Sequence, residues 1–83
     1  MSRILYVLDY LSHNTDAEKG ATLKEIQAYL LNQTNLGAVS VLSIKRDIER
    51  LDTMGYTVGV RKGAHNTAYY YMKERGFTFN EIR

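Results

Sequence analysis

Between residues 41 and 54, apolar positions recur every three or four residues, which is the period of an amphipathic α-helix. The apolar face holds Ile44, Ile48 and Leu51, and the opposite face holds Leu42, Arg46, Glu49, Arg50 and Thr53. Ser40 is suited to cap the first turn, because its hydroxyl can accept a hydrogen bond from an unpaired backbone N–H. Gly55 stands where a left-handed C-cap needs a residue without a Cβ. The pattern predicts one well-delimited helix.

Two more amphipathic segments come before this helix. Residues 3–12 carry a broad apolar stripe made of Ile4, Leu5, Val7, Leu8 and Leu11. Thr22 and Glu25 have the spacing of a capping box, in which each side chain bonds the other residue's backbone N–H. They predict a second helix over 23–32. Its inward-facing residues are expected to be Leu23, Ile26, Leu30 and Leu31. The polar stretch 14–21 contains a glycine and is expected to be a loop.

The period changes after the third helix. Residues 56–61 alternate loosely, and residues 68–72 are rich in tyrosine, which favours strands. The segment 62–67 between them has the composition of a loop. Together they predict an antiparallel hairpin with a six-residue tip. Leu36 and Val39 are expected to hold the turn between the second and third helices against the core.

The order of helices, turn and hairpin predicts an α+β fold of the winged helix-turn-helix class, with three helices plus a two-stranded wing. A short extra strand is expected near residues 20–22. We assign residues 1–76 to this DNA-binding domain. Thr78 and Glu81 repeat the capping-box spacing, so residues 77–83 are expected to begin a linker or a helix toward a following domain.

The composition excludes several classes of protein. The chain has 83 residues, the size of one small domain, and no cysteine, so disulfides and thiolate metal sites are ruled out. No apolar stretch approaches the roughly 20 residues needed to cross a bilayer. The N-terminal segment also lacks the small-residue cleavage site of a signal peptide. We therefore expect a soluble, cytoplasmic protein that does not bind membranes.

The formal net charge is +2, and the charges are unevenly distributed. Residues 1–40 contain three Lys/Arg against four Asp/Glu, whereas residues 41–83 contain eight against five. The basic half includes the predicted third helix and the hairpin, as a surface that faces phosphates requires. In a chain of this size, random scatter of the charges is the alternative explanation.

No catalytic arrangement is recognisable in the sequence. His13 and His65 have no partner at the spacing of metal ligands, which argues against a metal site. The glycines fall at turn or strand positions and do not form a phosphate-binding loop. Asp47 and Glu49 face different sides of one helix, so they make no acid–base pair. We expect no enzyme activity, no metal and no cofactor.

The third helix carries the main candidates for contact with DNA. They share its exposed side or its first turn: Ser40, Leu42, Ser43, Lys45, Arg46 and Arg50. Arg46 is the strongest, because it points away from the core and a guanidinium can pair bidentately with guanine. It could instead contact a phosphate, or pair with Glu49 or Asp47. Leu42 could touch a thymine methyl group or insert into a protein partner.

The predicted wing supplies a second group of candidates: Arg61, Lys62, His65 and Asn66. They could contact phosphates or enter the minor groove, and the alternative is a solvated loop. Lys24 is a candidate phosphate contact beside the dipole of the second helix, whereas Thr22 is interpreted as a cap. The tyrosines Tyr69 to Tyr71 alternate across a strand, so at least one of them should be core. Stacking on single-stranded nucleic acid is the less favoured interpretation.

These motifs, in this order, resemble the N-terminal winged-helix domain of WYL-type transcriptional regulators, a branch of the DeoR-like helix-turn-helix group. The matching pieces cover nearly the whole chain: RILYVLDYL, TDAEKGA, TLKEIQAYL, the pattern S-x-x-S-I-K-R-D-I-E-R-L, a Gly-Tyr exit, AYYYM and FTFNEI. The run from Arg46 to Glu49 is the most specific. The chain departs from the family at Val41 and Leu42, where basic or polar residues are usual, and at Lys45, where tyrosine or arginine is common.

The resemblance implies sequence-specific binding of double-stranded DNA in transcriptional regulation. The recognition helix 41–54 would enter the major groove, and the wing 61–67 would lie on flanking phosphates. It also implies a homodimer, formed through a C-terminal region absent here. The ligand-sensing domain of the family has no counterpart in this chain, so no effector site is expected. The alternative is a winged-helix module for protein–protein interaction or dimerisation without DNA binding, which Val41, Leu42 and the modest charge favour.

Overall fold

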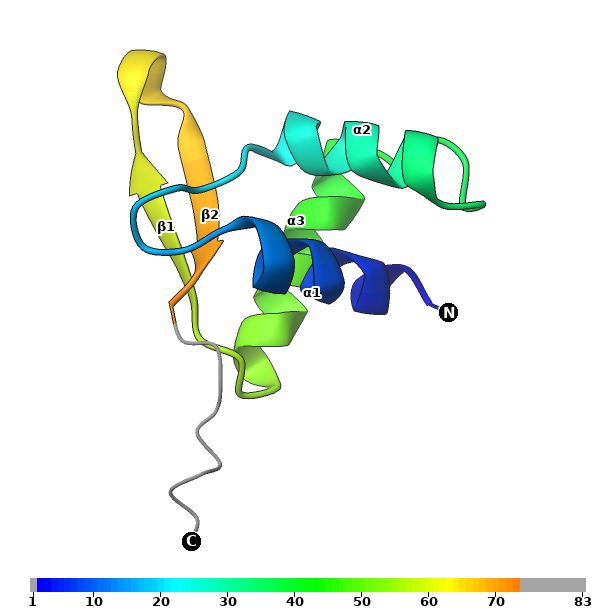
Figure 1. Ribbon diagram of the computed structural model, residues 1–83, viewed down its shortest axis with the longest axis horizontal. Helices are drawn as coiled ribbons and strands as arrows, with labels where there is room; N and C mark the ends of the chain where they lie inside the picture. Colours follow the sequence, from blue (N-terminus) through cyan, green and yellow to red (C-terminus); the bar gives the residue numbers. More distant parts are fainter. Residues whose placement is uncertain (1, 74–83) are drawn as a thin grey trace, which may run out of the picture.

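Three helices are followed by a two-stranded antiparallel sheet in the computed structural model, which describes residues 2–73 (Figure 1). The elements are α1 (Arg3–Asn14), α2 (Leu23–Gln33), α3 (Val41–Thr53), β1 (Val58–Lys62) and β2 (Ala68–Met72). This arrangement confirms the predicted α+β class and is that of a winged helix-turn-helix. In the view of Figure 1 the hairpin stands to the left of α1 and α2, and α3 crosses behind them. The predicted boundary at residue 76 and the predicted linker or helix over 77–83 lie outside the described residues.

One hydrophobic core joins all three helices to the hairpin. Its buried side chains are Val7, Leu11, Ala21, Ile26, Leu30, Ile44, Ile48, Leu51 and Met72. The apolar faces predicted for α1, α2 and α3 are thus confirmed in their centres. At their edges they are wrong, because Leu5 and Leu31 are 45% and 53% exposed. At about 100° per residue, Leu5 lies about 120° or more around α1 from the buried Val7 and Leu11, and Leu31 lies about 100° or more around α2 from the buried Ile26 and Leu30. Leu36 is also exposed, whereas Val39 packs against the core as predicted.

The predicted caps define where the helices begin and end. The Thr22 hydroxyl accepts a hydrogen bond from the Glu25 N–H at 3.1 Å, and the Glu25 carboxylate accepts one from the Thr22 N–H at 2.9 Å. At the end of α3, Gly55 has a φ of +106°, and the Tyr56 N–H donates to the Leu51 carbonyl at 3.1 Å. This bond, together with that from the Gly55 N–H to the Asp52 carbonyl, forms a Schellman motif and stops the helix.

The hairpin is shorter at its base and tighter at its tip than predicted. Pairing runs from Val58 opposite Met72 to Lys62 opposite Ala68, so Lys62 belongs to a strand and the tip contains five residues, 63–67. His65 and Asn66 have φ values of 55° and 64°, and the Thr67 N–H donates to the Ala64 carbonyl. Positive φ at both central residues matches the twist of a tight hairpin turn.

The two faces of the hairpin have different surroundings. Tyr70 packs against the core, as expected for one tyrosine of the three, while Tyr69 and Tyr71 occupy the other face. Tyr71 lies so close to Gly59 that a Cβ there would be 2.5 Å from its ring. The extra strand predicted near residues 20–22 is a single bridge, in which Ala21 exchanges two hydrogen bonds of 2.8 Å with Tyr70. Among the helices described in residues 2–73, none has the length and apolarity to span a membrane.

Candidate nucleic-acid interface

The outer face of α3 carries a row of exposed side chains. Leu42, Arg46, Glu49 and Thr53 succeed one another at helical spacing and are all exposed, and Lys45 and Arg50 flank the row. Leu42 is 54% exposed and is the apolar member of this otherwise polar row. The prediction that these residues point away from the core is confirmed. Whether any of them contacts DNA stays a prediction.

Arg46 is not engaged by the neighbouring carboxylates that the sequence offered as partners. Asp47 is 3% exposed and binds Arg3 from α1 instead. Within residues 2–73 the close contacts between basic and acidic side chains are Arg3 with Asp47 and His13 with Asp9, so Lys45, Arg46 and Arg50 have no carboxylate at ion-pair distance. These three cations are therefore available to an external anion.

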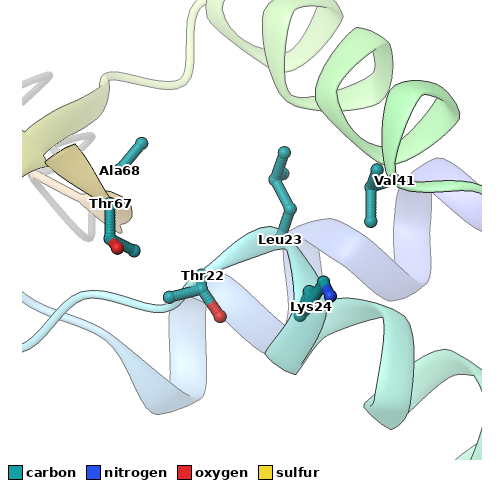
Figure 2. Close-up of a pocket in the computed structure, with 6 residues that line it drawn as sticks. All are labelled: Thr22, Leu23, Lys24, Val41, Thr67 and Ala68. Carbon is teal, nitrogen blue, oxygen red and sulfur yellow. The ribbon is translucent and has the colours of Figure 1, made fainter. Parts of the chain in front are cut away.

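The start of α2, the start of α3 and the wing surround one open groove of about 410 Å³ (Figure 2). Its walls are Thr22, Leu23, Lys24, Val41, Thr67 and Ala68. Figure 2 shows Leu23 between Val41 on one side and the wing residues Thr67 and Ala68 on the other. The amide of Gln27 donates to the Val39 carbonyl at 2.8 Å and so ties the turn before α3 to α2. The groove thereby gathers onto one surface the three elements that were predicted to meet DNA.

Lys24 lies on the rim of this groove and is exposed. It follows the N-cap of α2, where the positive end of the helix dipole adds to its charge. Ser40 and Ser43 lie at the corresponding end of α3. The Ser40 hydroxyl accepts a bond from the Ser43 N–H, and the two hydroxyls are 3.0 Å apart. Ser40 thus acts as the predicted cap, and an additional contact of either serine with DNA is untested.

The tip of the wing presents Lys62, His65 and Asn66, all exposed. Lys62 lies opposite Ala68 in the hairpin register, so both side chains emerge on the face that borders the groove of Figure 2. His65 and Asn66 occupy the turn itself. The tip and the start of α2 therefore present their cations toward the same space.

Arg61 has different surroundings from the other candidates. It is exposed, but its guanidinium donates to the carbonyl of Ala17 at 2.8 Å and to that of Glu18 at 3.4 Å. The same group lies 5.9 Å from the centre of the Tyr71 ring. It therefore already has partners on the loop between α1 and α2, on the opposite face of the hairpin from Lys62.

A second groove, of about 420 Å³, separates α3 from the base of the wing. Ile48, Val58, Val60 and Tyr70 contribute its apolar part, and Lys45, Glu49, Asp52 and Thr53 its polar rim. Glu49 and Asp52 make this side of α3 unfavourable for a phosphate backbone. Phosphate contacts are consequently best placed near the start of α3 and at the wing tip, away from the base of the wing.

The described residues contain no cluster of three or more His, Cys, Asp or Glu side chains that could hold a metal ion. His13 lies 3.1 Å from the Asp9 carboxylate on the exposed side of α1, far along the chain from the candidate interface. These contacts of His13 give no indication of a catalytic or metal-binding role.

A scan of protein-family models finds no match, and searches of curated proteins and of solved structures find none either. The chain is therefore classified by its fold alone, which is an α+β winged helix-turn-helix. The resemblance to WYL-type regulators stays a prediction.

The burial of Asp47 and the position of Thr67 in the groove were missed by sequence reasoning. Asp47 lies three residues after Ile44 and four before Leu51, a spacing that places it on the buried face and could have identified it. Thr67 lines the groove beside Lys24, but only the hairpin register brings it there, and its local sequence gives no signal.

Proposed function

We propose that this chain binds double-stranded DNA sequence-specifically in transcriptional regulation, with α3 in the major groove and the wing tip on flanking phosphates. The observation that carries the proposal is a set of exposed cations on three neighbouring elements. None of these cations has a carboxylate partner within residues 2–73. They are Lys24, Lys45, Arg46, Arg50 and Lys62. Cations without internal partners are those that can release counterions from a phosphate backbone.

The shape of the molecule supports the same function. An α-helix fits the major groove, where its exposed side chains can reach base edges. The protruding row on α3 combines a guanidinium, which suits guanine, with Leu42, which suits a thymine methyl group. The proposal includes a homodimer, because readers of this type usually bind two half-sites related by a two-fold axis. It also includes the cytoplasmic location expected from the sequence.

The test is fluorescence anisotropy of the purified chain with random-sequence duplex DNA at low and near-physiological salt. We expect binding that weakens steeply with salt, with a slope of about 0.9 per phosphate contact. The double variant Lys45→Glu/Arg46→Glu should abolish this binding. Lys19→Glu, which reverses one charge instead of two, is the control for a charge reversal outside the interface, because Lys19 is exposed and lies beside Tyr10 and Asn14 of α1. Selection of an operator from a random library follows, and absence of any preferred sequence would contradict sequence-specific reading.

The second candidate function is a protein-interaction module, and the exposure of Leu42 favours it. Leu42 is 54% exposed at the start of the exposed row on α3, where an apolar side chain would serve as the anchor of an interface. If a folded sample shows no binding of DNA even at low salt, this function becomes the better explanation.

A further inference from the structure

Arg61 and Lys62 are adjacent cations on β1, but strand alternation directs them to opposite faces of the wing. Arg61 lies opposite Tyr69 in the register, on the face that meets the α1–α2 loop. Lys62 lies opposite Ala68, on the face that borders the groove at the starts of α2 and α3. These two cations therefore have different neighbours, which suggests a different role for Arg61 and for Lys62.

The bonds of Arg61 belong to a larger joint between the wing and the segment 15–21. The Met72 N–H donates to the Thr15 hydroxyl at 3.0 Å, and this hydroxyl donates to the Leu11 carbonyl at 2.7 Å. Thr15 is only 6% exposed, so the joint at this point is buried. Toward the tip, Ala21 and Tyr70 exchange their two bonds. Arg61 adds a contact in the middle of the same segment, at Ala17 and Glu18.

The fit between the loop and the hairpin is close. A Cβ on Gly20 would lie 2.8 Å from the Cβ of Tyr69 and 3.2 Å from the Tyr70 carbonyl oxygen. The guanidinium of Arg61 reaches two consecutive carbonyls, those of Ala17 and Glu18, with separate nitrogens. Such a two-pronged contact suits the planar fork of arginine and cannot be reproduced by the single ammonium of lysine.

We propose that Arg61 is a positioning residue, which fixes the wing to the α1–α2 loop, and that Lys62 makes the phosphate contact of the wing. The proposal rests on the DNA-binding function proposed above and refines its site. By holding the hairpin against the loop, Arg61 sets where the tip stands relative to α3. The competing explanation is that the remaining donors of the guanidinium bind phosphate directly.

The first arm of the test needs no DNA. Amide hydrogen exchange is measured on the free chain for wild type, Arg61→Lys, Arg61→Ala and Lys62→Ala. The informative amides are those of Ala21, Tyr70 and Met72, because each is bonded across the joint. Both Arg61 variants should exchange about three- to tenfold faster there, the factor for loss of one or two exposed hydrogen bonds. Lys62→Ala should match wild type. Unchanged exchange in Arg61→Ala would overturn the proposal.

The second arm compares DNA binding of the same variants. Lysine can bind a phosphate as a point charge, whereas it cannot keep the two-pronged contact with the loop carbonyls. A phosphate role therefore predicts that Arg61→Lys binds like wild type and that Arg61→Ala lowers the salt slope by about one. The positioning role predicts that both variants bind more weakly with the wild-type slope, while Lys62→Ala lowers the slope by about one. If wild type itself does not bind, the proposed function fails, and the exchange measurement alone decides whether Arg61 anchors the wing.

Discussion

Arg3, in the first turn of α1, binds Asp47 in the middle of α3 through two hydrogen bonds, from Nε at 2.5 Å and from Nη2 at 3.2 Å. The carboxylate is almost fully buried, whereas the Arg3 side chain is 41% exposed. The hydrogen bond that Arg3 donates to Asp47 and the charge of this carboxylate together raise the pKa of Arg3 against the opposing effect of burial. The pair joins the two helices on the side of α3 away from the groove at the base of the wing, and so fixes the rotation of the face that carries Arg46.

Removal of Arg3 should destabilise the fold, because Asp47 would be left buried without its partner. For Arg3→Met we expect a loss of about 1–3 kcal/mol in the free energy of unfolding. This is below the 3–5 kcal/mol typical of fully buried pairs, since Arg3 is partly solvated. Urea denaturation measures the loss. The double variant Arg3→Met/Asp47→Leu should recover part of it, because no buried charge remains. A double variant less stable than the single one would contradict this account.

Tyr10 should make stability fall at alkaline pH. Burial raises the pKa of its phenol above the ordinary value of 10, with smaller contributions from the charges of Glu25 and Tyr29. The folded state thus holds this proton more tightly than the unfolded state does. Its stabilising effect is complete below about pH 10 and is lost as the pH rises through the folded-state pKa. An NMR titration of the tyrosine rings measures this pKa, and Tyr10→Phe should remove its share of the alkaline loss.

The causes of the Tyr10 shift can be separated with Glu25→Gln, which retains the capping-box geometry. The pKa of Tyr10 should fall but stay above its ordinary value, because burial is the larger cause. The ring lies 4.8 Å from that of Tyr29, centre to centre, and this packing is unchanged by the substitution. A pKa that returned to the ordinary value would show that the charge of Glu25, and not burial, dominates.

The helices of this fold were predictable because their signals are local. Periodicity gave the buried centres of all three, and Thr22, Ser40 and Gly55 marked three of their ends through caps that the structure contains. The exposed positions of Leu5 and Leu31 were missed because they depend on how far a neighbouring helix reaches around each apolar stripe. The sequence pattern of a single helix does not show how much of its surface a neighbouring helix covers.

The candidate site was predictable as a set of exposed residues, but its internal connections were not. Arg3 and Asp47 are separated by 44 positions, and no local sequence pattern around Arg3 predicts that Asp47 is its partner. Arg61 likewise meets Ala17 across 44 positions, and its face depends on a strand register that was not known from the sequence. Long-range pairing of this kind is decided by packing and not by local propensity.

Arg46 should contribute base reading if α3 enters the major groove. For Arg46→Ala we expect a loss of about 1–3 kcal/mol in binding to a selected operator and relaxed specificity at one position. Arg46→Lys separates the two possible contacts, because it keeps the charge and removes the bidentate fork. Reading of a base predicts that lysine behaves like alanine at the operator. Equal affinity of wild type and Arg46→Lys, with the same sequence preference, would assign Arg46 to a phosphate.

Leu42 distinguishes the two proposed functions. If it touches a base edge, Leu42→Asp and the uncharged Leu42→Gln should both weaken binding to the operator and leave self-association unchanged. If it anchors a protein partner, both variants should abolish association. Leu42→Gln should then have little effect on DNA affinity. Leu31→Asp is the matched control, since Leu31 is 53% exposed on α2, at almost the same exposure as Leu42. Anisotropy and sedimentation on the same samples measure both properties. We expect weaker DNA binding with unchanged association, and the reverse result would move the assignment to the interaction module.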